Sequence, residues 1–173
     1  MHCDTTVDCG SSDYGVVVQP STGELVGYAW SPNIGWIKFG GLSSFPGSGG
    51  PSVNARLDAG SGQLRGWARA CAATIGGDCS SMATDPNALG WDGWINLRHD
   101  GGDYVVAFST AQQPDGSYEA DPSNHYAWGG NTVMGWLDFS QVTLGGTPPP
   151  PAAPTLTATD CVIAVGASTC DSN

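Results

Sequence analysis

The chain repeats one motif three times between residues 14 and 139, and this repeat constrains the fold more than any other feature. Each copy begins with a Val-rich or otherwise apolar stretch, passes a glycine-containing turn, and reaches an aromatic-Ala-x segment. It then closes on Gly-Trp-(Ile/Leu)-x-(Phe/Leu), at residues 35–39, 93–97 and 135–139. Self-similarity of this kind is typical of repeat architectures. We therefore expect three equivalent structural units.

The local pattern of each copy predicts three short strands. Its first segment is rich in β-branched residues, and the turn that follows carries glycine, in the third copy as Asp115-Gly116. No segment keeps a helical hydrophobic period for more than a turn or two. The sequence predicts an all-β domain of three meander repeats, packed as a sandwich, a barrel or a prism. A single unit cannot bury its own tryptophans, so the copies must pack together.

Composition excludes several functional classes. Of 173 residues, 12% are charged, against roughly 25% in an average soluble domain, and seven Trp accompany 26 Gly. This is neither a disordered nor a helical composition. Acidic residues outnumber basic ones 16 to 5, for a net charge of −11, which argues against nucleic acid and anionic lipid as partners. No apolar run approaches the roughly 20 residues of a membrane helix.

The six cysteines form three close pairs along the chain. Six cysteines allow 15 connectivities, and loop-closure entropy favours the local ones. The spacing is not that of a zinc or redox site, so we expect no metal and an oxidising, extracellular location. The middle pair lies in an insertion of the second copy, residues 70–90. The predicted disulfides are Cys3–Cys9, Cys71–Cys79 and Cys161–Cys170.

The ends of the chain predict that it is part of a longer modular protein, and the pattern of residues 1–13 is not the one expected of a signal peptide. Residues 1–13 are expected to be the end of a preceding repeat with its Cys loop, and residues 14–144 the three-repeat domain. Residues 145–154 form a Pro-rich linker that favours an extended conformation. Residues 155–173 predict the start of a second β-module.

The first copy carries a resemblance to a known repeat. Residues 27–37, Gly-Tyr-Ala-Trp-Ser-Pro-Asn-Ile-Gly-Trp-Ile, resemble the G-Y-A-W-S-x-N-I-G-W-I repeats of predicted secreted or surface proteins of candidate-phylum bacteria. Residues 161–170 resemble the opening of the Ig-like modules that often follow them. The second copy departs from this pattern at Arg69, and the third at residues 129–134. The resemblance implies a cell-surface location rather than a chemical activity.

Catalytic signatures are absent from the sequence. It contains no GxSxG, HExxH, P-loop or GxGxxG motif, so we expect a protein that is not an enzyme and needs no cofactor. His2, His99 and His125 are scattered, and a structural role is expected for His125. Loops 100–103 and 115–117 carry oxygen ligands for calcium, but neither fits a known calcium-loop pattern, and we expect solvated acidic turns there. Carboxylates that would be available to a glycosidase are Asp92, Asp100, Asp103 and Glu119.

Aromatic residues are the better functional candidates. Rings at equivalent positions of the copies predict a repeat core made of Tyr28, Trp36, Trp67, Trp94, Tyr126 and Trp136. The irregular tryptophans are candidates for stacking on a ligand such as a sugar ring: Trp30, Trp91 and Trp128.

Two functions are consistent with these features. The first is a non-enzymatic structural module of an extracellular surface or appendage protein, as a stalk, adhesin or filament subunit. Its partners would be other copies of itself or adjoining modules. The alternative is a lectin-like, carbohydrate-binding module that uses exposed tryptophans.

Overall fold

The computed structural model describes residues 15–114, 116–131 and 133–145. Over these residues the chain forms one antiparallel sheet of 11 strands that does not close into a barrel. Two short 3-10 turns, η1 (Cys71–Ala73) and η2 (Pro86–Ala88), are the only helical elements in the same residues. The all-β prediction is therefore confirmed, and the barrel alternative is wrong for this part of the chain.

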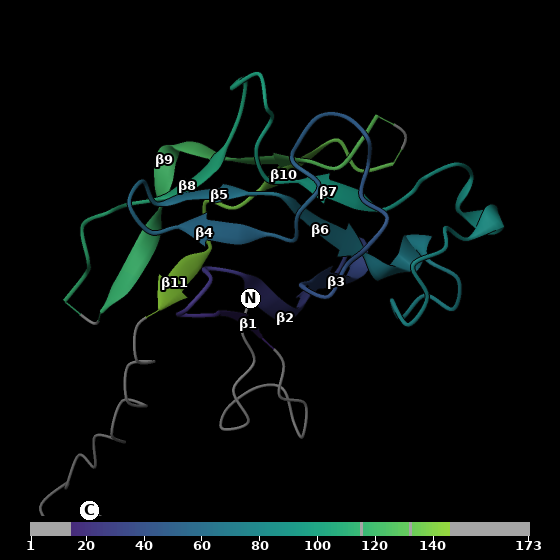
Figure 1. Cartoon of the computed structure of the whole chain (residues 1–173), viewed down its shortest axis with the longest axis horizontal. Helices are drawn as coiled ribbons and strands as arrows, with labels where there is room; N and C mark the ends of the chain where they lie inside the picture. The colour runs from purple at the N-terminus through teal and green to yellow at the C-terminus, as the bar shows by residue number, and fades with distance from the viewer. Residues whose placement is uncertain (1–14, 115, 132, 146–173) are drawn as a thin grey trace, which may run out of the picture.

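The strands follow the order of the repeat. Their bounds are β1 (Val16–Val18), β2 (Leu25–Ser31), β3 (Gly35–Phe39), β4 (Arg56–Asp58), β5 (Gln63–Arg65), β6 (Trp67–Ala70), β7 (Trp94–Asn96), β8 (Val106–Phe108), β9 (Ser117–Trp128), β10 (Trp136–Asp138) and β11 (Thr143–Gly145). The first copy contributes β1–β3, the second β4–β7 and the third β8–β10. Hydrogen bonding runs in the order β1-β2-β3-β6-β7-β9-β8-β5-β4, and β10 and β11 both pair with β9 (Figure 1).

The three copies build the same hairpin in the same register. In each, the last residue of the aromatic-Ala-x segment lies opposite the Trp of the closing motif: Trp30 opposite Trp36, Arg69 opposite Trp94, and Trp128 opposite Trp136. The repeat predicted from the sequence is therefore a repeat of structure as well.

Neighbouring copies are joined by one repeated contact. Lys38 of β3 lies opposite Arg69 of β6, and Asn96 of β7 lies opposite Trp128 of β9. Lys38 and Asn96 both occupy the variable position of the closing motif, so each hairpin joins the next in an equivalent register.

The second copy has four strands instead of the expected three. Its middle strand is divided at Gly66, which adopts a φ of +84°. A Cβ at this position would lie 2.5 Å from the carbonyl oxygen of Asn54, so only glycine fits without a shift of the backbone.

The last strand, β11, was not predicted from the sequence. It lies antiparallel to β9, on the opposite side from β8. The first strands of the earlier copies are placed in the same way: Arg56 of β4 bridges Glu24 next to β2, and Ala107 of β8 lies opposite Gln63 of β5. β11 therefore stands where the first strand of a fourth copy would lie.

The main hydrophobic core is largely aliphatic and contains no tryptophan among its buried members. It draws on the first, second and third copies alike. The buried members are Leu25, Ile37, Phe39, Ala55, Leu64, Ala68, Ile95, Leu97, Val106, Phe108 and Ala127.

The prediction that the repeated rings form this core is wrong for Tyr28, Tyr126 and Trp136, which are 36%, 44% and 56% exposed. Side chains alternate along a strand, so in the closing motif the Ile or Leu and the Phe or Leu face the core while the Trp faces away. Trp36 is half-buried on that outer face.

Two of the repeated rings, Trp67 and Trp94, are buried as predicted. They lie outside the main core, in a separate cluster with Leu42, and Phe45 and Met82 pack against it. The outer face of the middle copy thus has a small core of its own.

The insertion in the second copy is closed by the Cys71–Cys79 disulfide, whose Cα atoms are 4.7 Å apart. This predicted bridge is confirmed. The other two predicted pairs, Cys3–Cys9 and Cys161–Cys170, lie outside the described residues, as do residues 1–13, most of the linker and the predicted second module.

Candidate functional site

The outer face of the sheet carries three clusters of side chains at equivalent positions, one in each copy. We call them the copy-1 cluster (Tyr28, Trp30, Trp36), the copy-2 cluster (Trp67, Arg69, Trp94) and the copy-3 cluster (Tyr126, Trp128, Trp136). The strand register places them there, since their members lie opposite one another in each hairpin or two residues apart along a strand.

The copy-1 and copy-3 clusters have closely similar ring geometry. Trp30 and Trp36 meet edge to face with centroids 5.0 Å apart, and Trp128 and Trp136 do so at 4.7 Å. The tyrosine adds a second such contact to the same Trp, at 6.3 Å in copy 1 and 6.4 Å in copy 3. Edge-to-face packing fixes the rings against one another, so both clusters are preorganised.

The copy-2 cluster is covered by the chain itself. Phe45 packs on Trp94 with centroids 5.5 Å apart, and Leu42 belongs to the same buried cluster. The Trp67 indole N–H donates to the carbonyl of Pro51 at 3.0 Å. The segment that follows β3 therefore seals this part of the outer face.

Arg69 explains why the second copy departs from the aromatic pattern. Its guanidinium lies 4.6 Å from the centroid of Trp94, the same partner position that Trp30 uses in copy 1. It is fully buried and donates to the carbonyls of Asp92 and Met82 and to Thr84 Oγ1. Burial lowers the pKa of Arg69 below its usual value. The planar guanidinium of Arg69 thus takes the place of the tryptophan ring found in the other copies. Its hydrogen bonds hold the insertion to the sheet.

A groove of about 520 Å³ opens between the covered middle copy and the exposed third copy. A second hollow of about 450 Å³ lies on the other side of the Tyr104–Trp136 pair, whose rings meet edge to face at 5.1 Å. The lining of the groove is mainly aromatic, from Trp67, Trp94, Tyr104, Trp128 and Trp136.

The polar side chains that line the groove include two carboxylates. Asp92, Asn96, His99 and Asp103 all line it. His99 Nδ1 lies 2.9 Å from Asp103 Oδ2. Burial, and then the charge of Asp103, raises the pKa of Tyr104 to about 12, so the phenol stays neutral and remains a donor.

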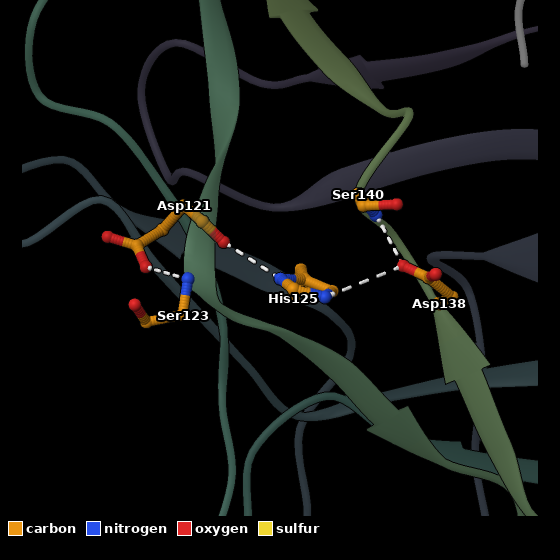
Figure 2. Close-up of polar contacts among 5 residues, drawn as sticks. All are labelled: Asp121, Ser123, His125, Asp138 and Ser140. Carbon is orange, nitrogen blue, oxygen red and sulfur yellow. Dashed lines mark hydrogen bonds and ion pairs between the residues drawn. The ribbon is translucent and has the colours of Figure 1, made fainter.

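His125 contacts residues of both β9 and β10, as Figure 2 shows. Its Nδ1 lies 3.0 Å from the carbonyl oxygen of Asp121, and its Nε2 lies 3.8 Å from Asp138 Oδ1. The backbone N–H of Ser140 donates to Asp138 at 2.8 Å, and this bond lowers the pKa of that carboxyl. The side chain of His125 therefore lies between β9 and β10 with a polar contact to each, and its structural role stays a prediction.

The three tryptophans that the sequence suggested for ligand stacking differ in their exposure to solvent. Trp30 is 41% exposed, and Trp128 is half-buried in the groove lining. Trp91 is buried against Ala70 and Ala73, so its proposed role on the surface is wrong. Sequence reasoning missed Tyr104 as a site residue, because nothing in the repeat places it beside Trp136.

The other candidate chemistries gain no support from the described residues. No group of three or more His, Cys, Asp or Glu side chains there is placed to hold a metal ion, and no helix there is long and apolar enough to cross a membrane. Of the four carboxylates considered for hydrolysis, Asp92 and Asp103 line the groove, whereas Asp100 and Glu119 do not. No family model, curated protein or solved structure matches this chain.

Proposed function

We propose that this domain is a non-catalytic, glycan-binding module of an extracellular surface protein, of the adhesin kind. The observation that carries the proposal is the exposed, preorganised copy-3 cluster at the edge of an aromatic groove. Monomeric proteins rarely expose such rings together without a binding role. The C–H faces of a sugar ring stack on aromatic faces, while its hydroxyls need partners at the rim.

The charge of the groove favours neutral sugars. Asp92 and Asp103 offer acceptors for hydroxyl groups, and the Tyr104 phenol offers a donor. The chain carries a net charge of −11, which repels acidic glycans at long range. The Cys71–Cys79 disulfide supports an extracellular location.

A glycan array followed by tryptophan-fluorescence titration tests the proposal. We expect neutral glycans to bind, and Trp136→Ala to weaken binding by about tenfold, the size of one strong aromatic contact. Leu89→Ala is the matched control, because Leu89 is 88% exposed and lies outside the groove lining. No bound glycan, or equal affinity in both variants, contradicts the proposal. Release of new reducing ends would overturn its non-catalytic part.

A structural module, as a stalk or filament subunit, is a second candidate. The repeated register between copies favours it, because an array joined in this way extends by adding copies. Its partners would be adjoining modules or other copies of the chain. Negative-stain imaging of the full chain distinguishes the two states: filaments support this candidate, and monodisperse particles at all concentrations argue against it.

A further inference from the structure

The proposed function assigns a ligand to the groove but not to the second hollow, on the other side of the Tyr104–Trp136 pair. The volume of the second hollow, about 450 Å³, is close to the 520 Å³ of the groove, and both lie in the range of small-ligand sites. Asp103, Tyr104 and Trp136 line both cavities. Because the same three side chains bound both, the groove and the second hollow adjoin.

The wall between the two cavities is fixed by ring contacts. Tyr104 meets Trp136 edge to face at 5.1 Å and stacks on the His99 ring with centroids 5.7 Å apart. Trp136 also has edge-to-face contacts with Trp128 and Tyr126, at 4.7 and 6.4 Å, and yet remains 56% exposed. A ligand on either side of this wall therefore meets an aromatic surface whose shape is already set, which lowers the entropic cost of binding.

The lining that belongs to the second hollow alone comes mainly from β9 and is polar. Ser123, Asn124 and Tyr126 are exposed there, and each carries a hydroxyl or an amide. The backbone N–H of Ser123 donates to Asp121 Oδ1 at 2.8 Å, as Figure 2 shows, and the Asn124 amide donates to the same oxygen at 3.1 Å. These two bonds fix the chain between Asp121 and Asn124, so the polar groups at the second hollow are held in place.

The charges of the two linings favour a neutral ligand. The described residues that line the groove and the second hollow include no lysine or arginine. The carboxylates among them are Asp92, in the groove alone, and Asp103, which both cavities share. An acidic sugar would lie beside negative charge without a permanent cation to pair with, whereas the hydroxyls of a neutral sugar find partners in both cavities.

We infer that the second hollow is a further sugar subsite, and that the domain binds a neutral, unbranched oligosaccharide with consecutive rings on the two sides of the Tyr104–Trp136 wall. This inference rests on the proposed function and deepens it from one sugar to a chain of sugars. A single glycosidic oxygen joins neighbouring sugars, so rings in adjoining cavities can belong to one molecule. The second ring then binds at a high effective concentration, and an oligosaccharide binds more tightly than a monosaccharide.

The first test measures affinity against chain length by calorimetry. The probes are glucose, N-acetylglucosamine and mannose, each as the monosaccharide and as its β-1,4-linked di- and tetrasaccharide. In at least one series, we expect the tetrasaccharide to bind the native chain at least about tenfold more tightly than the monosaccharide, the gain from one added ring contact. Trp136→Ala removes the shared wall and should weaken the binding of every length.

The second test uses Asn124→Ala, because Asn124 lines the second hollow and not the groove. We expect this variant to lose about fivefold in tetrasaccharide affinity, the size of one hydrogen bond, and to bind the monosaccharide in the groove as the native chain does. Asn87→Ala is the matched control. Asn87 is also exposed and donates its amide to an aspartate, Asp85 Oδ1, at 2.9 Å, but it lines neither cavity.

The outcomes separate the inference from the proposed function. If the native chain binds none of these sugars and no glycan on the array, both fail. If the mono- and tetrasaccharides bind equally tightly and Trp136→Ala weakens both, the proposed function stands and the second subsite is overturned. Equal tetrasaccharide affinity in Asn124→Ala and Asn87→Ala overturns it as well. If glycans on the array bind but none of the linear chains does, the proposed function again stands without the inference.

Discussion

The middle copy of the repeat and its two neighbours build the same hairpin, yet present opposite surfaces. In the middle copy, Phe45 and the insertion after β6 cover the outer face, and Arg69 stacks on Trp94. In the flanking copies a tryptophan stands at the position of Arg69, and the tyrosine and one tryptophan of each cluster are exposed.

This difference shows that one hairpin register can have different surroundings in each copy. In the middle copy, the long connections build a second small core that holds the insertion to the sheet. In the flanking copies, the tyrosine and one tryptophan of each cluster are exposed. The same register therefore buries its outer-face side chains in one copy and exposes part of them in the two others.

The largest expected effect comes from the glycine before each closing tryptophan. Gly35, Gly93 and Gly135 have φ values of +71°, +75° and +63°. A Cβ on Gly93 would lie 2.6 Å from the carbonyl oxygen of Ala70, whereas one on Gly135 meets nothing within 4 Å. We expect Gly93→Val to cost about 4 kcal/mol of unfolding free energy, and Gly35→Val and Gly135→Val about 2 kcal/mol. Urea denaturation measures these losses of unfolding free energy. Equal losses at the three sites would show that the middle copy is packed no more tightly around its glycine than the flanking copies are.

The next largest effect on stability is expected from removal of the Arg69 side chain. Arg69→Ala removes a buried side chain and leaves the part-buried acceptors of Met82, Asp92 and Thr84 without their charged donor, at an expected cost of about 3 kcal/mol. Arg69→Trp restores the pattern of the other copies but not these bonds, so it should not rescue stability. The control is Arg65→Ala, an exposed arginine, expected to change stability by less than about 0.5 kcal/mol. Similar unfolding midpoints for the Arg69 and Arg65 variants would show that Arg69 does not anchor the insertion.

Removal of the Cys71–Cys79 bridge should act on the middle copy alone. The bridge spans a sequence separation of 8 residues, and the chain-entropy model assigns about 2.5 kcal/mol to so short a loop. After replacement of both cysteines by alanine, hydrogen exchange should rise across residues 71–92 and stay unchanged in β2 and β3. Faster exchange in β2 and β3 as well would mean that the insertion stabilises the whole sheet.

The smallest effect concerns the ionisation of Tyr104 beside the copy-3 cluster. Its pKa of about 12 in the folded chain is above the ordinary value near 10, so folding favours the neutral phenol. The associated stability is complete below pH 10 and is lost as the pH rises through about 12. An ultraviolet titration should show one late phenolate step that Tyr104→Phe removes. If that variant leaves the late step in place, the burial of Tyr104 against Trp136 is wrong.

Much of the fold follows from the sequence alone. The copies, their antiparallel hairpins, the special glycines and the Cys71–Cys79 bridge all depend on neighbours close in the chain, which a sequence displays directly. Strand β11 escaped prediction because a lone strand of three residues has too little pattern, and only its pairing with β9 identifies it.

The tertiary structure decided which aromatic side chains are buried and which are exposed. Alternation along a strand puts Trp136 and Leu137 on opposite faces, but both side chains are apolar, so the pattern does not say which face is the core. Distant segments decide that: Phe45 covers Trp94, while Trp91 is buried against Ala70 and Ala73. The sequence alone therefore determined that equivalent rings exist. Only long-range packing determined which of them remain exposed, because burial depends on what else the fold brings to that face.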